Sequence, residues 1–146
     1  REEGVEVVIV GTGSSENYTG RHGYPLKVDT SADKVDAKDF DAVVIPGGWA
    51  PDALRRYPSV LKIVRDAFAQ GKVVGAICHA GSVLVSANVL HGKTATCFSA
   101  IKDDVINAGA EYVDREVVRD GNLITSRTPN DLPAFMREII KAMKEK

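Results

Sequence analysis

The 146-residue chain contains 44% hydrophobic and 27% charged residues, a profile typical of one soluble globular domain over residues 1–146. This composition excludes a disordered, collagenous or disulfide-stapled protein. Its 19 basic and 20 acidic side chains give a net charge of −1, so the sequence has no electrostatic footprint for nucleic acid or for an anionic membrane surface. We therefore expect a small molecule or a peptide as the partner.

Short β-branched runs alternate along the chain with segments of helical spacing, and this alternation predicts a sheet covered by helices on both faces. The predicted strands are 5–10, 41–45, 72–77, 94–98, 111–113, 116–118 and 123–126. The predicted helices are 51–70 with a restart at Pro58, 81–90, 101–108, and a last helix that Asn130 or Asp131 caps and that runs through Met143. The fold class is therefore α/β, with a doubly wound, mostly parallel sheet.

Two stretches of the sequence need separate consideration. Arg1–Gly4 looks like the last turn and glycine cap of a helix, so we expect a preceding strand and helix, about 20 residues, to belong to the natural protein. The uncharged run Val73–Leu90 has the length of a membrane span, but glycine and polar residues interrupt it. This pattern favours a buried strand that leads into a buried helix, and we expect no membrane contact.

Cys78 stands where a buried strand ends and a helix begins, within the run 72–82. Ala76 and Ala80 lie two positions to either side of it, as in a nucleophile elbow, where small neighbours let strand and helix backbones come close together. Unpaired backbone N–H groups at such a turn favour a thiolate. The spacing predicts that Cys78 is a nucleophile; the alternative is a small buried hydrophobic residue.

His79 directly follows the cysteine and is its natural base, although adjacent side chains pair only where the backbone turns between them. A glycine turn, Gly47-Gly48, follows the strand at 41–45, at the sheet edge where open α/β folds bind ligands. Because glycine permits close backbone approach, we expect the amides of Gly48 and His79 to form an oxyanion hole. The alternatives are a satisfied polar residue at a helix start for His79 and a plain turn for the glycines.

The remaining cysteine and histidines carry no such pattern. Cys97 has neither an elbow nor an adjacent histidine, so we expect an inert buried thiol. The two cysteines form no CxxC pair, which favours free thiols in a reducing compartment, the cytoplasm. His22 and His91 lie in a turn and at a helix end, without metal-ligand spacing. We expect no metal and no cofactor.

From Glu2 to Met143 the chain resembles the ThiJ/PfpI superfamily, and a histidine directly after the cysteine is similar to the PfpI branch. The segments that carry the resemblance are GRHGYPLKVD, FDAVVIPGG, GKVVGAICHAG, IKDDVINAGAEYVD and SRTPNDLPAFMRE. The resemblance implies a flavodoxin-like fold, similar to class I glutamine amidotransferases. It also implies a homo-oligomer, either a dimer or a hexamer.

The resemblance implies a role for several residues. Cys78 matches the family nucleophile and His79 its base. Asp52 matches the acidic member of the triad, which a neighbouring subunit is thought to supply; the family protease has glutamate there, and the alternative role of Asp52 is a helix cap. Phe98 stands where that protease has a tyrosine in the pocket wall. Arg127 matches a loop near the site, and its alternative role is to hold a structural carboxylate. A further family glutamate, which touches the cysteine, has no counterpart among these residues.

These observations predict a cysteine-dependent hydrolase in which Cys78 attacks an electrophilic carbonyl. The resemblance implies either an intracellular peptidase or an enzyme of glyoxal-type aldehydes and their protein adducts, so the expected substrate is a small aldehyde or a short peptide. The predicted site comprises Cys78, His79 and Asp52 as catalytic residues, with Gly47, Gly48, Phe98 and Arg127 around the substrate. The alternative is a stress protein without turnover, in which an oxidisable Cys78 acts as a redox sensor or the chain acts as a chaperone.

Overall fold

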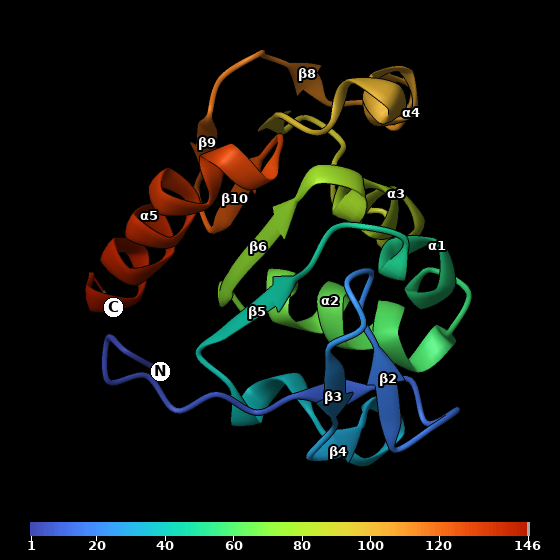
Figure 1. The fold of residues 1–146 in the computed structure, drawn as a ribbon. Helices are drawn as coiled ribbons and strands as arrows, with labels where there is room; N and C mark the ends of the chain where they lie inside the picture. Colours follow the sequence, from blue (N-terminus) through green and yellow to red (C-terminus); the bar gives the residue numbers. More distant parts are fainter. Residues whose placement is uncertain (146) are drawn as a thin grey trace.

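A four-stranded sheet lies at the centre of the computed structural model, which describes residues 1–145 (Figure 1). Its strand order is β5 (Ala42–Ile45), β6 (Val73–Ile77), β10 (Leu123–Ser126) and β9 (Val117–Asp120). β5, β6 and β10 are parallel, whereas β9 runs antiparallel to β10. The predicted α/β class with a mostly parallel sheet is confirmed.

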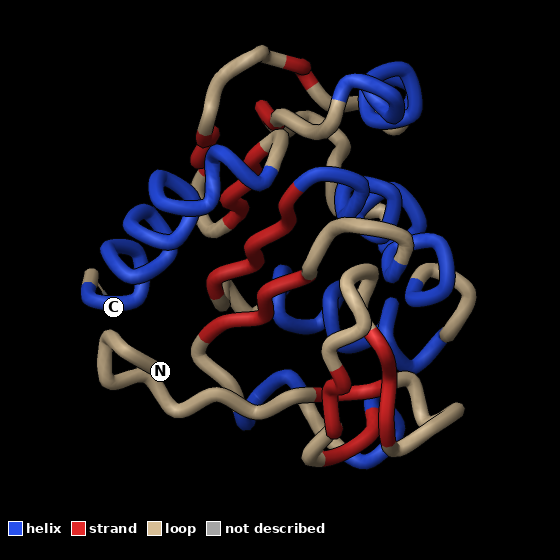
Figure 2. Tube along the Cα trace, viewed as in Figure 1, coloured by secondary structure: helices blue, strands red, loops and turns tan. Residues whose placement is uncertain are grey.

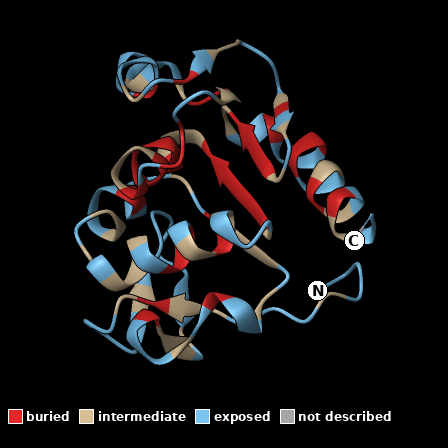
Figure 3. Cartoon of the chain, turned by 180° about the vertical axis from the view of Figure 1, so that it is seen from behind, coloured by how far each residue is buried: buried red, intermediate tan, exposed pale blue. Residues whose placement is uncertain are grey.

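Helices cover both faces of this sheet because residues of the buried strand β6 alternate between two apolar clusters (Figure 1). Val73 and Ile77 pack with the residues of α5, whereas Val74 and Ala76 pack with those of α2 and α3. All five residues of β6 are buried, as Figure 3 shows by its red strand. The helices are α2 (Pro58–Ala69), α3 (Gly81–Ala87) and α5 (Leu132–Lys144).

Helix α5 packs closely against the sheet at Gly75, in the middle of β6. A Cβ atom on this glycine would lie 2.7 Å from Cδ1 of Ile139 and 3.1 Å from Cζ of Phe135. The side chains of α5 therefore fill the space that any larger residue at position 75 would need. This contact fixes β6, and with it the residue that follows its end, against the C-terminal helix.

The shorter elements surround this core, and Figure 2 shows how much of the chain between them is loop. They are β1 (Val10–Gly11), β2 (Asn17–Thr19), β3 (Pro25–Lys27), β4 (Thr30–Ser31), α1 (Ala50–Leu54), β7 (Thr94–Ala95), α4 (Lys102–Asn107) and β8 (Glu111–Tyr112). The strands predicted at 5–10 and 94–98 are wrong in length, because each has a ladder partner over only two residues. The hairpin of β2 and β3 has no counterpart among the sequence predictions. Within residues 1–145, no helix combines the length and apolarity of a membrane span.

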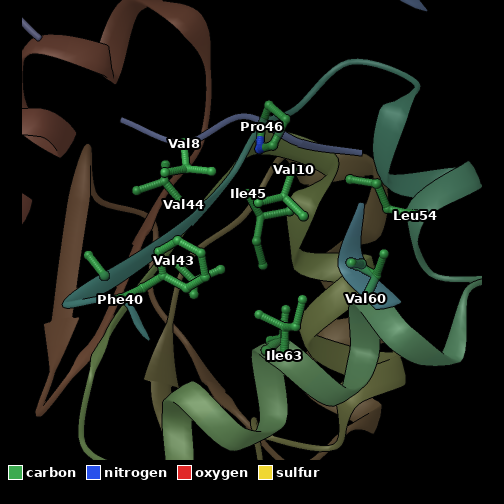
Figure 4. A pocket seen from close by; sticks show the side chains of 13 residues that line it. Val8, Val10, Phe40, Val43, Val44, Ile45, Pro46, Leu54, Val60 and Ile63 are labelled. Carbon is green, nitrogen blue, oxygen red and sulfur yellow. The ribbon is translucent and has the colours of Figure 1, made fainter. Parts of the chain in front are cut away.

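One edge of β5 is open. Among the described residues β5 pairs only with β6, and β1 pairs only with β4. A cavity of about 160 Å³ lies beside β5, with Val8, Val10, Val44 and Ile45 in its wall (Figure 4). Val44 is 46% exposed, and the segment before β1 is drawn largely as exposed chain in Figure 3. This cavity lies apart from Cys78, which does not line it.

Candidate active site

Cys78 lies at the corner between β6 and the helical segment that follows it. Its backbone φ is +62°, in the left-handed region that residues other than glycine rarely adopt. A 3₁₀ turn, Cys78–Ala80, leads from this corner directly into α3. The N–H of Phe98 donates to the carbonyl oxygen of Cys78 at 3.3 Å and ties the corner to the neighbouring segment. The strained strand-turn-helix geometry is that of a nucleophile elbow.

The glycine turn after β5 meets this corner. A Cβ atom on Gly47 would lie 2.8 Å from Cβ of Cys78, 3.1 Å from the carbonyl oxygen of Ile77 and 3.6 Å from Sγ of Cys78. Gly48 follows with φ +70°, a conformation that glycine adopts without steric cost. The lack of a side chain at position 47 therefore allows the β5 loop to touch the cysteine.

His79 lies beside the sulfur in spite of its adjacent position in the sequence. Its Nδ1 is 3.4 Å from Sγ of Cys78, because the left-handed turn brings the two side chains to the same side. The imidazole lies near two aromatic rings, with centroid distances of 4.9 Å to Phe98 and 5.8 Å to Trp49. A thiol and an imidazole in contact, with half-buried Cys78 open to solvent on one side, form the pair that nucleophilic catalysis requires.

Asp52 lies in the first turn of the short helix α1 and does not touch the Cys78–His79 pair. Its side chain is exposed and makes no hydrogen bond or ion pair with any residue in the described part of the chain. No carboxylate within residues 1–145 contacts the His79 imidazole. The catalytic role of Asp52 therefore stays a prediction, and among the described residues of one copy His79 has no acidic partner.

Arg127 follows β10, whose last residue pairs with the last residue of β6. Its guanidinium donates to both carboxylate oxygens of Asp131, at 3.0 and 3.1 Å, and to Asp114 at 2.8 Å. Asp131 is buried, and this ion pair holds the pKa of its carboxyl below the usual range. The backbone N–H groups of Arg127 and Thr128 also donate to Asp131. In this chain the guanidinium thus holds carboxylates and shapes the loop; its predicted role toward substrate stays a prediction.

Cys97 has a different environment. It is 1% exposed, and burial raises the pKa of its thiol to about 12, with a smaller contribution from the carboxylate of Asp104. This thiol remains protonated at neutral pH, as an inert structural cysteine does. Within residues 1–145, no three histidine, cysteine or acidic side chains come together as a metal site.

Trp49 belongs to the site, although its sequence context predicts no role for it. It follows Gly48 and its indole is 78% exposed, while its ring lies against His79. Two sequence features could have indicated a role for Trp49: it is the only tryptophan of the chain, and it directly follows a glycine pair at the end of a predicted strand.

The model of the DJ-1/PfpI family matches residues 1–142. The chain belongs to the DJ-1/PfpI family. It is 49% identical over 144 residues to "Deglycase PH1704" of Pyrococcus horikoshii, and the alignment covers 99% of this chain and 86% of that relative. It is 43% identical over 143 residues to "Putative cysteine protease YraA" of Bacillus subtilis, and this alignment covers 98% of the chain and 85% of that protein.

A solved DJ-1/PfpI structure has nearly the same backbone. The crystal structure of a two-domain protein from Anabaena variabilis, with DJ-1/ThiJ/PfpI-like and ferritin-like domains, superposes with a TM-score of 0.95 at 46% identity. The match covers 98% of this chain and 43% of that one. The family and the fold expected from the nucleophile-elbow segment and its flanking motifs are therefore confirmed.

Proposed function

We propose that this DJ-1/PfpI protein is a cysteine-dependent hydrolase in which Cys78 attacks an electrophilic carbonyl and His79 moves the proton. The observation that carries this proposal is the contact of 3.4 Å between Sγ and Nδ1 at a backbone corner of positive φ. The names of the relatives, a deglycase and a putative cysteine protease, support a hydrolytic reaction at a carbonyl.

For an acyl substrate the steps follow from these two side chains. Sγ of Cys78 forms a bond to the carbonyl carbon, and the resulting oxyanion faces the backbone N–H groups of Gly48 and His79. The imidazolium of His79 gives its proton to the leaving nitrogen as the carbon–nitrogen bond breaks. Water then attacks the thioester carbon, gives a proton to His79, and releases the acid and the free cysteine.

A glyoxal adduct of an amine requires an internal redox change in addition. Adduct plus one water gives the free amine and a hydroxy acid: the aldehyde carbon is oxidised to the acid while the neighbouring carbonyl carbon is reduced to the alcohol. The electrons stay within the substrate, so this reaction needs no external oxidant. We propose this second reaction as the finer assignment, because relatives of this chain, among them "Deglycase PH1704" of Pyrococcus horikoshii, are named deglycases.

The matched pair of cysteine variants tests the proposal. Cys78→Ser should lower both methylglyoxal consumption and peptide cleavage by about 10³-fold or more, since the nucleophile is lost. Cys97→Ala removes the other thiol and should keep the wild-type rate. If Cys78→Ser retains the activities of the wild type, the hydrolase assignment is wrong.

The second candidate function is a redox sensor without turnover. It is favoured by the difference in access between the two thiols, because Cys78 is half-buried and Cys97 is sealed. An accessible thiol oxidises to the sulfenic and then the sulfinic acid with peroxide. Selective peroxide modification of Cys78, together with the absence of both hydrolytic activities from the wild type, would favour the sensor.

Oligomeric state and compartment belong to the same proposal. We propose a cytoplasmic homo-oligomer, a dimer or a hexamer, in which the exposed Asp52 of one copy lies near His79 of another. Support for it comes from the absence, within residues 1–145 of one copy, of any carboxylate on His79. Sedimentation measures the state, and Asp52→Asn tests whether a shared site needs this carboxylate.

A further inference from the structure

Phe98 lies against the imidazole of the proposed base. The centroid of its ring is 4.9 Å from that of His79, with an angle of 34° between the planes, which is within the range of paired aromatic rings. Both side chains are partly buried. The indole of Trp49 lies further away, at 5.8 Å, and is 78% exposed. Phe98 is therefore the closer and the better buried of the two rings beside His79.

Backbone contacts tie Phe98 to the corner that carries the imidazole. Its N–H donates to the carbonyl oxygen of Cys78 at 3.3 Å. The preceding residue, Cys97, is 1% exposed, and its Cβ lies 3.3 Å from the position that a Cβ on Gly81 would take at the start of α3. Because these contacts hold residue 98 against the turn that contains His79, the two rings keep their relative position.

Hydrogen bonds alone do not fix the imidazole. Among residues 1–145 its only hydrogen-bonding contact is the one of 3.4 Å between Nδ1 and Sγ of Cys78, so no second polar partner limits rotation of the ring. The base of a nucleophilic pair is usually oriented by a third group, most often a carboxylate that accepts a hydrogen bond from it. In the described part of one copy, an aromatic ring lies against the imidazole instead.

We propose that Phe98 is a positioning residue, whose ring confines the imidazole of His79 to the orientation in which Nδ1 faces Sγ of Cys78. This role rests on the proposed function, because it acts on the two side chains to which the reaction is assigned. Confinement by packing requires a flat face and no polar group, so tyrosine at position 98 should serve as well as phenylalanine. Phe98 acts through His79 and needs no contact with substrate, so the role is separate from its predicted place in the pocket wall.

A double-mutant cycle on the alkylation of Cys78 tests this role without substrate. Iodoacetamide reacts with the thiolate, so the rate depends on how well the imidazole takes up the thiol proton. Phe98→Leu should lower the rate constant at Cys78 about fivefold, the size expected for the loss of one aromatic pair, and Phe98→Tyr should keep the wild-type rate. In the His79→Ala protein, Phe98→Leu should have no further effect, since no imidazole remains to be positioned.

The cycle separates positioning from a general effect on the fold. Peptide mass spectrometry reads the label at Cys78 apart from any label at Cys97. Phe98→Met, which also lacks a flat face, should give the same fall as Phe98→Leu, so the test does not depend on the folding of a single variant. Equal effects of Phe98→Leu with and without His79 would overturn the proposal, and so would a wild-type rate in both Phe98→Leu and Phe98→Met.

Steady-state kinetics with methylglyoxal supply a second readout. Phe98→Leu should lower kcat about fivefold with KM unchanged, because the orientation of the base affects the chemical step. Phe68→Leu is the matched control: Phe68 is also partly buried, but its ring faces Nζ of Lys93 at 5.5 Å, and this variant should keep the wild-type kcat. An equal fall of kcat in the two variants, or a change in KM alone in Phe98→Leu, would overturn the positioning role. Absence of turnover in the wild type would instead contradict the proposed function, and the alkylation cycle would still decide the role of Phe98.

Discussion

The two cysteines of the chain are 19 positions apart (97 − 78) and occupy opposite kinds of environment. Cys78 lies at a strained corner with an imidazole in contact and solvent on one side. Cys97 is sealed in the core, and burial raises the pKa of its thiol to about 12. The difference teaches that the backbone, rather than the amino acid, determines which thiol is available for chemistry.

Thiol alkylation should show the largest contrast. A pKa of about 12 lowers the thiolate fraction of Cys97 at neutral pH by about 10³-fold relative to an ordinary thiol, and burial also blocks the reagent. We expect iodoacetamide to label native Cys78 and to spare Cys97 until the protein unfolds. Peptide mass spectrometry measures both sites, and comparable labelling rates in the native state would contradict the contrast.

Substitution of Gly47 should disturb the Cys78 corner alone. An alanine Cβ would lie 2.8 Å from Cβ of Cys78, so the cysteine must shift, and misplacement of this kind lowers kcat/KM by about 10- to 100-fold. Gly20→Ala is the matched control, because neither Gly20 nor Gly47 has a positive φ and the nearest atom to a Cβ on Gly20, the carbonyl oxygen of Tyr24, lies 3.6 Å away, at an ordinary van der Waals distance. Equal losses of activity in the two variants would mean that the effect does not come from the contact with Cys78.

The loop after β10 is held by the ion pair of Arg127 and Asp131, and the contribution of this pair to stability changes with pH. Asp131→Asn should lower the free energy of unfolding at pH 7 by about 2 kcal/mol, since it removes the charge of a buried carboxylate that accepts hydrogen bonds from the partly exposed Arg127. The folded-state pKa of Asp131 is lowered, so its stabilising effect is complete above the unfolded pKa of about 3.9 and disappears as the pH falls through the folded value. Urea unfolding at pH 7 and at pH 3 should therefore show a smaller difference between variant and wild type at pH 3. A difference that grows in acid would have the wrong sign.

Substitution of the buried Cys97 by serine should lower the free energy of unfolding and leave the catalytic rate unchanged. Cys97→Ser places a hydroxyl in an apolar site and should cost about 1–2 kcal/mol of unfolding free energy, whereas Cys97→Ala keeps the apolar character. The kcat of folded Cys97→Ser should equal that of the wild type. A fall in kcat at full folding would mean that Cys97 belongs to the reactive site after all.

The corner and the strands of the core were predictable because their signals are local. The β-branched runs around Val74 and Ile124 predict buried strands, and the small residues around Cys78 predict an elbow. Strand length was not predictable, since it depends on a partner: the run at 5–10 has strand composition, but only Val10–Gly11 has a ladder. The ring contact of Trp49 with His79 joins residues that are 30 positions apart in the sequence, and a local sequence pattern does not predict such a contact.

The left-handed backbone of Cys78 has a consequence for the stability of the whole molecule. A side chain with a Cβ at φ +62° raises the free energy of the folded state by about 1–2 kcal/mol, and glycine would not. Cys78→Gly should thus melt at a higher temperature than Cys78→Ala, with neither able to turn over substrate. The protein maintains its reactive sulfur at the expense of thermal resistance, a trade-off between activity and robustness that is confined to a single residue.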